Sequence, residues 1–414
     1  MALPALLRKV FESDGYGPKL NRSVIPFAAS LASDSATDVA STEWVKDLYN
    51  TTIYISPNAP QSNDGFSASS PVTFTKALEI AYFSPHTAVW RFEIAGGTYS
   101  ENIEISNLKV FFNLNGNVII DGYLSIYNST VATNDTSYSL KVTKGSAAYA
   151  LKITNSTCAF SYPVETTLSN ANKSSGLCCY LLASVVVFNK TLTINANPCY
   201  SGLYVESSYV AIADETNIKG SSISDGFVAT LNSAVVFNGD FYIADTDVYH
   251  GASVLNSSHV TFNNYNSFYG NYINLFAQDN SQVNFASAPV NFRAKANGYA
   301  VWAENSSSLH FYSGNIACDA TSCDAVFRLI NGSVVSITGN NSVTLGCAGS
   351  GTSYAQVGGG SVFTLSSSVS VYNAFSGRKY TVNYGGLIVV NGAGQDRLPG
   401  TAGSYSISTG GEYY

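Results

Sequence analysis

A short phrase returns about once every 25 residues along most of this chain, and it constrains the fold more than any other feature. The phrase is a small residue, then Ser, then two apolar residues separated by one position. Its serines are Ser129, Ser156, Ser184, Ser208, Ser233, Ser258, Ser281, Ser307, Ser333 and Ser361, and a degenerate copy follows at Gly385-Gly386. Self-similarity at such a period indicates a solenoid, in which each repeat buries its apolar face only against its neighbours.

The residues two and four positions after each Ser form two apolar columns. A spacing of two places both members of a pair on one face of a strand. The first column is mostly β-branched and the second mostly Phe, as in Val235/Phe237, Val260/Phe262, Val283/Phe285 and Leu309/Phe311. We expect one continuous interior stack formed by Phe237, Phe262, Phe285 and Phe311.

Three short strands per turn account for the remaining pattern. The segment before each Ser alternates, with inward candidates six and four residues upstream, as in Phe227/Ala229, Leu275/Ala277, Val301/Ala303 and Phe327/Leu329. The small residues at the phrase form a bend, and a third strand is indicated by Leu192/Ile194, Phe241/Ile243 and Val369/Val371. The sequence therefore predicts an all-β chain that forms a right-handed parallel β-helix of about 11 coils. The alternative is an antiparallel β-sandwich, which does not hold one in-phase phrase for eleven turns.

The chain divides into four parts. Residues 1–52 precede the repeat and are expected to hold a short amphipathic helix after Pro4, a linker at 29–41 and a second helix near Trp44. Residues 53–99 are the opening segment, with a capping helix near Phe74–Ala81 that covers the end of the core. The parallel β-helix occupies 100–390. The tail, 391–414, is expected to be too rich in glycine to add to the core.

Composition restricts the partners. Only 11% of residues are charged and the net charge is −7, so nucleic acid is not expected as a ligand. A surface so poor in charge needs covering by other copies of the chain. The outward apolar positions expected at that interface are Leu203, Val205, Val228, Ala234 and Val236. No apolar segment is long enough for membrane insertion.

The cysteines and histidines suggest no metal site or cofactor. The seven cysteines read as small buried side chains, with Cys158 and Cys178 at inward positions. Cys318 and Cys323 could pair across a loop. The first ten residues have the wrong charge order for a secretory signal, so synthesis in a cytoplasm is expected.

Several motifs resemble those of a known family. The stretch Tyr54-Ile-Ser-Pro57, with Asn63-Asp-Gly65, Ser70-Pro71, Phe74-Thr75 and Ile94-Ala-Gly-Gly-Thr-Tyr99, resembles the start of pectin-lyase-like parallel β-helices. The first 30 residues, with Leu3-Pro4, Gly17-Pro-Lys-Leu-Asn21 and Ile25-Pro26, resemble the virion-attachment end of bacteriophage tail fibres and tailspikes. The end of the chain, with Leu398-Pro-Gly400 and Thr409-Gly-Gly411, is similar to the glycine-rich terminus of such fibres.

The resemblance implies a homotrimeric receptor-binding protein of a phage tail, made in the host cytoplasm and located in the virion. Its N-terminus would bind a phage tail or baseplate protein, and its solenoid a bacterial surface polysaccharide or lipopolysaccharide. The anchors expected at the virion are Leu6, Leu7, Val10, Phe11 and Ile25. Some relatives cleave their glycan and others only bind it.

Carboxylates that could cleave a glycan are sparse. Hydrolysis needs two carboxyl groups across the scissile bond. The best candidates are Asp245 and Asp247, which lie two residues apart, with Asp214 about one coil earlier. The alternative is that these residues form a solvated bend between coils. We therefore expect no confident catalytic site.

A binding site has a clearer signal. At the outward positions five and three residues before the Ser, aromatic or guanidinium groups stand beside amide and carboxylate groups. Such groups suit stacking against a sugar with hydrogen bonds at its edge. The glycan-binding candidates are Phe276, Gln278, Trp302, Glu304 and Arg328. The alternative is that Phe276 and Trp302 continue the interface between copies.

These observations predict a tail fibre or tailspike that recognises a bacterial surface glycan for host adsorption. A glycan depolymerase of the same fold is the second hypothesis. A structural rod that carries a separate receptor-binding protein is the third.

Overall fold

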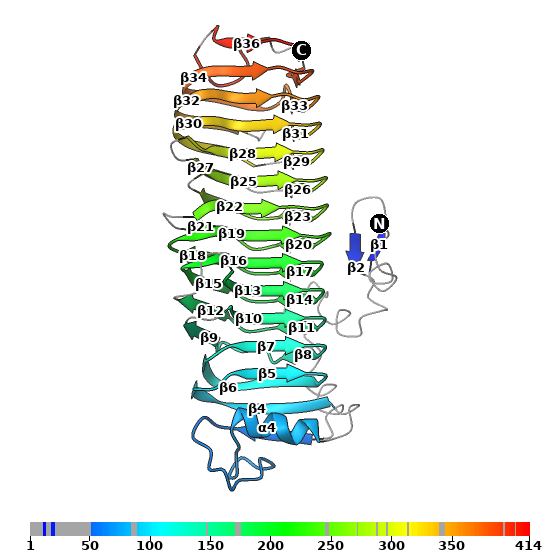
Figure 1. Cartoon of the computed structure of the whole chain (residues 1–414), viewed down its shortest axis with the longest axis vertical. Coiled ribbons are helices and arrows are strands. Elements are labelled where there is room, and N and C mark those ends of the chain that lie inside the picture. Colours follow the sequence, from blue (N-terminus) through cyan, green and yellow to red (C-terminus); the bar gives the residue numbers. More distant parts are fainter. Residues whose placement is uncertain are drawn as a thin grey trace.

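The computed structural model describes residues 11–13, 18–20 and 51–414, with gaps at 84–88, 146–147, 170–174, 245–247, 271, 287–288, 295–296, 313, 339–343, 392–393 and 402. From residue 51 onward every strand pairing is parallel, and the strands form a solenoid of about eleven turns (Figure 1). The predicted parallel β-solenoid is confirmed. No helix among the described residues has the length and apolar character needed to cross a membrane.

Each turn contributes one strand to each of three sheets, which we call sheets A, B and C. Sheet A precedes the Ser bend and contains β5 (Ile103–Ser106), β7 (Leu124–Tyr127), β10 (Tyr149–Thr154), β13 (Leu177–Leu182), β16 (Cys199–Glu206), β19 (Ile223–Thr230), β22 (Val248–Val254), β25 (Ile273–Gln278), β28 (Tyr299–Glu304) and β36 (Tyr405–Ile407). Sheet B follows the bend and contains β8 (Thr130–Thr133), β11 (Thr157–Phe160), β14 (Val185–Phe188), β17 (Tyr209–Ile212), β20 (Ala234–Phe237), β23 (His259–Phe262), β26 (Gln282–Phe285), β29 (Ser308–Phe311), β31 (Val334–Ile337), β33 (Val362–Leu365), β35 (Leu387–Val389) and β37 (Glu412–Tyr413).

Sheet C completes the turn with β9 (Leu140–Gly145), β12 (Val164–Ser169), β15 (Leu192–Asn197), β18 (Thr216–Gly220), β21 (Phe241–Ala244), β24 (Asn266–Gly270) and β27 (Val290–Ala294). Longer strands belong to two sheets in succession: β4 (Val89–Tyr99), β6 (Lys109–Asp121), β30 (Ile316–Ile330), β32 (Thr344–Val357) and β34 (Ser370–Val382). β3 (Thr51–Ile55) pairs with β4 at the first turn.

The predicted phenylalanine stack lies in the interior beneath sheet B. Phe237, Phe262, Phe285 and Phe311 are at most 1% exposed. Successive ring centroids are 5.0, 5.1 and 4.6 Å apart, with interplanar angles of 6°, 12° and 4°. The parallel register holds each ring directly over the ring of the preceding coil, and the prediction is confirmed.

The repeated serines form a ladder along the bend between sheets A and B. The backbone N–H of one serine donates to the Oγ of the serine in the next coil, at 3.0–3.3 Å, continuously from Ser129 to Ser258. The same bond joins Ser281 to Ser307 and Ser333 to Ser361. All these serines are nearly inaccessible. The hydroxyl therefore satisfies a backbone donor that the bend would otherwise bury without a partner.

The bend gains one residue partway along the solenoid. In the coils up to Ser208 a single residue before the serine has positive φ, as at Ser207, whereas later coils have two, as at Leu231 and Asn232. The serine hydroxyl accordingly donates to the carbonyl two residues upstream at Ser208 but three upstream at Ser233. One added residue reverses which side chains of the preceding strand point inward.

Because of this change, two positions that were expected at the interface point inward instead. Leu203 and Val205 lie on the early side of the change and point into the core, where both are 0% exposed. Val228 pairs with Tyr204, on the outer face of sheet A, and neighbouring side chains leave it 2% exposed. Ala234 and Val236 face outward on β20, as predicted.

The capping helix α4 (Phe74–Tyr82) lies across the N-terminal end of the solenoid (Figure 1). Its first turn begins after Thr73, whose hydroxyl accepts a hydrogen bond from the Lys76 N–H, the usual N-cap contact. Phe74, Ala77, Leu78 and Ala81 are buried against the first turns. The helix therefore closes the open end of the core.

The glycine-rich tail adds to the solenoid, contrary to our expectation. β36 and β37 extend sheets A and B, and Leu398 is 1% exposed in the core. Glycine permits this because the tail approaches the preceding coil closely: a Cβ on Gly400 would lie 2.8 Å from the Lys379 Cα.

Other predictions concern the N-terminus and the cysteines. Of the expected helix after Pro4, only Phe11 is described, and it begins β1 (Phe11–Ser13), which pairs antiparallel with β2 (Pro18–Leu20). Leu6, Leu7, Val10, Ile25 and the expected helix near Trp44 lie outside the described residues. Cys158 and Cys178 are buried as predicted. Cys318 and Cys323 are buried on one strand, β30, rather than on either side of a loop.

Candidate functional site

The outer face of sheet A carries a group of aromatic side chains, which we call the aromatic cluster: Tyr249, Tyr272, Phe276, Tyr299 and Trp302. Phe276 and Trp302 are direct lateral neighbours in the register of β25 and β28, with ring centroids 5.8 Å apart. Tyr299 lies 4.9 Å from Trp302, and Tyr249 stacks on Tyr272 at 5.0 Å. The rings thus form one contiguous surface across three coils.

Arg328 closes the C-terminal side of the aromatic cluster. Its guanidinium carbon lies 4.0 Å from the Trp302 ring centroid and 5.1 Å from that of Tyr299, within cation–π range. Its Nη1 donates to the Tyr299 hydroxyl at 2.8 Å, and that hydroxyl donates to Asp324 at 3.1 Å. Burial raises the pKa of Tyr299, which keeps the phenol a donor at neutral pH.

A small apolar cluster outside the main core supports these rings. Ile273, Tyr299 and Ala325 are aligned in successive coils and are buried, and they form a group separate from the solenoid interior. Phe276 and Trp302 pack against this group. Rings held on such a base keep their orientation before a ligand arrives, which reduces the entropy lost on binding.

Polar groups border the cluster along one edge. Gln278 pairs with Glu304 in the register, two residues beyond Phe276 and Trp302. The Trp302 Nε1–H donates to Glu304 at 3.1 Å. The structure therefore brings together all five predicted glycan-binding residues, each of them half-buried.

A buried carboxylate and an imidazole lie at the N-terminal side of the cluster. Asp225 is 5% exposed, and its Oδ1 lies 2.9 Å from the His250 Nδ1 and accepts a 2.7 Å hydrogen bond from Ser253. The His250 ring is 4.6 Å from that of Tyr249 and 5.7 Å from that of Phe276. Because Nδ1 contacts Asp225, Nε2 is the ring nitrogen available to a ligand. The serine bonds to the carboxylate rather than to the imidazole, so the three groups lack the order of a Ser-His-Asp triad.

The described residues do not show the candidate catalytic carboxylates as a pair. Asp214 is exposed and accepts a hydrogen bond from Thr191 at 3.2 Å. Asp245 and Asp247 lie outside the described residues. Within the described part of the chain, no group of three His, Cys, Asp or Glu side chains is placed to hold a metal ion.

The sequence reasoning missed Tyr249, Tyr272, Tyr299 and the Asp225–His250 pair. A signal for the pair was present, since Asp225, His250 and Tyr299 each stand eight residues before the serine of their coil. This column lies two positions upstream of the inward candidates that stand six residues before each serine. The register places these positions side by side on sheet A.

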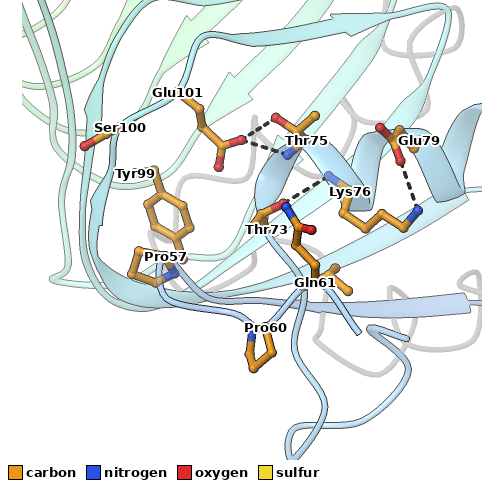
Figure 2. A pocket seen from close by; sticks show the side chains of 11 residues that line it. Pro57, Pro60, Gln61, Thr73, Thr75, Lys76, Glu79, Tyr99, Ser100 and Glu101 are labelled. Carbon is orange, nitrogen blue, oxygen red and sulfur yellow. Dashed lines mark hydrogen bonds and ion pairs between the residues drawn. The ribbon is translucent and has the colours of Figure 1, made fainter. Parts of the chain in front are cut away.

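A hollow of about 590 Å³ lies beside the start of α4 and is lined by Pro57, Gln61, Thr75, Tyr99 and Glu101, among others (Figure 2). The Glu101 carboxylate accepts hydrogen bonds from the Phe74 and Thr75 N–H groups at 3.1 and 3.0 Å and from the Thr75 hydroxyl. The chain's own carboxylate thus satisfies the helix N-terminus, where an anion would bind. This hollow belongs to the cap.

Comparison of the chain with protein-family models, with curated proteins and with solved structures found no match. The assignment of a function therefore depends on the geometry of the site and on the motifs of the sequence.

Proposed function

We propose that this protein is a glycan-binding receptor protein of the phage tail-fibre or tailspike kind, and that the aromatic cluster is its binding site. The observation that carries the proposal is the lateral row formed by Phe276, Trp302 and Arg328 in three successive coils. Apolar sugar faces stack on aromatic rings, and sugar hydroxyls hydrogen-bond to amides and carboxylates. Gln278 and Glu304 supply those groups beside the rings.

The extent of the cluster suits an elongated ligand. It runs from Tyr249 on β22 to Arg328 on β30, a distance of three coil steps or about 14 Å at the usual spacing between strands. Val228 and Ser253 continue the row toward the N-terminus and separate the aromatic cluster from Tyr204. A polysaccharide chain lying along the solenoid axis would contact several coils at once.

The experiment is binding of the purified full chain to bacterial capsule and lipopolysaccharide preparations, with Trp302→Ala as the test variant. We expect at least tenfold weaker binding, since losing one aromatic stack and its edge contacts removes about 1.4 kcal/mol or more. Tyr127→Ala is the control, because Tyr127 is an exposed aromatic residue on sheet A far from the cluster. Equal binding by wild type and Trp302→Ala would reject the site.

Sizing the glycan after incubation separates adhesion from cleavage. Intact, retained glycan supports a binding protein. Shortened chains would support the depolymerase hypothesis and would direct attention to His250, the titratable group oriented at the edge of the cluster.

The attachment part of the proposal concerns residues 1–30. Support comes from the resemblance of that segment to virion-attachment ends. Deleting residues 1–30 should leave a folded, glycan-binding solenoid that is missing from virions. Normal occupancy of the truncated chain on particles would contradict this role.

A further inference from the structure

The outer face of sheet A carries a second group of aromatic side chains nearer the N-terminal end of the solenoid, around β10, β13 and β16 (Figure 1). We call this group the tyrosine–lysine cluster, and its members are Tyr123, Tyr149, Lys152, Tyr180 and Tyr204. The ring centroids of Tyr123 and Tyr149 are 5.4 Å apart, and those of Tyr180 and Tyr204 are 5.7 Å apart. All five side chains are half-buried, so part of each one is accessible to a ligand.

The tyrosine–lysine cluster and the aromatic cluster lie on the same two lateral rows of sheet A. In coil order, the first row contains Lys152, Tyr180, Tyr204, Val228, Ser253, Phe276, Trp302 and Arg328. The second row starts at Tyr149 and reaches Tyr299 through the same pairings. Lys152 and Trp302 are six coil steps apart, or about 29 Å at the usual spacing between strands. An elongated ligand on one cluster therefore extends along the axis toward the other.

A cation lies over aromatic rings in both clusters, but its bonding differs. The Lys152 Nζ lies 5.2 Å from the Tyr149 ring centroid and 5.8 Å from that of Tyr180. Arg328 has a similar position in the aromatic cluster, where it also donates to the Tyr299 hydroxyl. Among the described residues, Lys152 has no hydrogen bond or ion pair. Its ammonium group has three N–H donors, and these are available to a ligand.

The carboxylates near the tyrosine–lysine cluster are bonded to its phenols. Glu206 accepts a hydrogen bond from the Tyr180 hydroxyl at 2.9 Å, and Glu104 accepts one from the Tyr123 hydroxyl. Burial and the bond to Glu206 raise the pKa of Tyr180, and the bond to Glu104 raises the pKa of Tyr123 to about 12. Both phenols therefore stay protonated at neutral pH and add no negative charge to the surface.

The two clusters differ in their balance of charge. Three carboxylates and one guanidinium border the aromatic cluster, namely Asp225, Glu304, Asp324 and Arg328. The tyrosine–lysine cluster has two phenol-bonded carboxylates and two ammonium groups, because the Lys144 Nζ lies 5.5 Å from the Tyr123 ring centroid. An anionic ligand group is therefore disfavoured at the aromatic cluster, whereas it meets an unpaired ammonium group at Lys152.

We infer that the tyrosine–lysine cluster is a second subsite of the glycan-binding surface, and that it takes a sugar unit bearing a carboxylate or a phosphate. Lys152 donates to the anionic group, and the rings of Tyr180 and Tyr204 contact the apolar face of the sugar. A charge-assisted hydrogen bond is roughly twice as strong as a neutral one, so this contact discriminates acidic from neutral glycans. The inference rests on the proposed function and adds the class of ligand, which is an acidic glycan with its charged unit at the N-terminal end of the strip.

The test is binding of the purified full chain to capsule and lipopolysaccharide preparations in three forms: native, with carboxyl groups reduced by carbodiimide and borohydride, and with phosphate removed by hydrofluoric acid. We expect one of the two treatments to weaken wild-type binding about tenfold, and that treatment identifies the anionic group. Lys152→Met should weaken binding of the native glycan about tenfold but should bind the sensitive treated form as the wild type does. Lys152→Arg should retain most of the affinity. Lys219→Met removes an exposed charge from the outer face of sheet C and should change nothing.

Trp302→Ala separates this inference from the proposed function, because it should weaken binding of the native and treated glycans alike. Equal binding by Trp302→Ala and wild type, or no wild-type binding to any preparation, would reject the proposed function and this inference together. Weaker binding by Trp302→Ala with unchanged binding by Lys152→Met would overturn the acidic subsite alone, as would equal wild-type binding of all three forms.

A second measurement needs no variant and covers the case in which Lys152→Met fails to fold, as judged by circular dichroism. Added salt screens the contact between an ammonium group and an anion. Wild-type binding of the native glycan should therefore weaken more steeply with salt than binding of the sensitive treated form. An equal dependence on salt for all three forms would count against the acidic subsite.

Discussion

The backbone N–H of Ser233 donates a 3.2 Å hydrogen bond to the Oγ of Ser258, the serine at the same bend of the next coil. Ser233 in turn uses its own hydroxyl to bond the Thr230 carbonyl at 2.6 Å. The serine hydroxyls of the ladder thus do two things. They accept a hydrogen bond from a backbone N–H of the preceding coil, and they donate one to a backbone carbonyl of their own coil. This relationship explains why the repeated phrase keeps a serine while the residue before it varies.

Removing a hydroxyl from the ladder should destabilise the solenoid. Ser258→Ala leaves the Ser233 N–H buried without its partner, which costs about 1–3 kcal/mol. Chemical denaturation of the variant should show the loss. Ser257→Ala is the control, because that side chain is exposed at the same bend and its loss should cost much less. Equal costs would mean that the ladder contributes nothing specific.

The phenylalanine stack should be equally sensitive. Phe262 is 0% exposed and stacks between Phe237 and Phe285. Phe262→Ala should lower the free energy of unfolding by about 3–5 kcal/mol through lost burial and the cavity left behind. Phe66→Ala, at a ring that is 54% exposed, should leave the unfolding midpoint nearly unchanged. A small effect at Phe262 would require the core to collapse around the cavity.

Lys379 should anchor the C-terminal tail. It is 4% exposed, and its Nζ donates to the carbonyls of Asp396 and Leu398 at 3.0 and 3.1 Å. Lys379→Met keeps the aliphatic length but leaves both carbonyls without this donor. We expect faster tryptic cleavage after Arg397 in the variant, read out by mass spectrometry. Lys219→Met, on the outer face of sheet C, should leave the cleavage rate unchanged.

The solenoid should lose stability as the pH falls from about 7 toward 5. Burial lowers the folded-state pKa of His259, with a further contribution from His310, and burial also lowers that of His310. Below the unfolded pKa of about 6.5 the unfolded chain binds protons that the folded chain resists, so unfolding becomes more favourable. The loss should stop once the pH passes below the folded values.

Thermal unfolding at pH 7.5, 6.5 and 5.5 would measure this effect. The double variant His259→Asn/His310→Gln should show a flatter dependence than the wild type over the same range. An unchanged slope in the double variant would show that other groups cause the dependence.

The periodic part of the fold could be predicted from the sequence because each coil repeats the same apolar columns and the same serine bend. The serine phrase, the β-branched column and the Phe column recur with a spacing of two, and the structure places them as predicted. The five glycan-binding candidates also meet on one face, because strands in register carry equivalent positions side by side. Tyr249 and the Asp225–His250 pair could not be predicted in this way, because their columns lie upstream of the repeated phrase.

The two wrong assignments at the expected interface have one physical origin, which is the length of the bend. One extra residue after Ser208 turns the outward column of earlier coils into the inward column of later ones, so Leu203 and Val205 were assigned to the wrong side. No residue type in the sequence indicates that insertion. A bend with one residue of positive φ and a bend with two use the same small polar residues.

The sequence by itself determined that this chain is a parallel solenoid, since a regular 25-residue phrase can bury its apolar columns only by stacking. Only the tertiary structure decided which columns share a face, because the position of a strand in the sheet depends on hydrogen-bond register between residues far apart in the chain. It thereby set Arg328 over Trp302 and joined Asp225 to His250. Local sequence defines a coil, and the register between coils defines its surfaces.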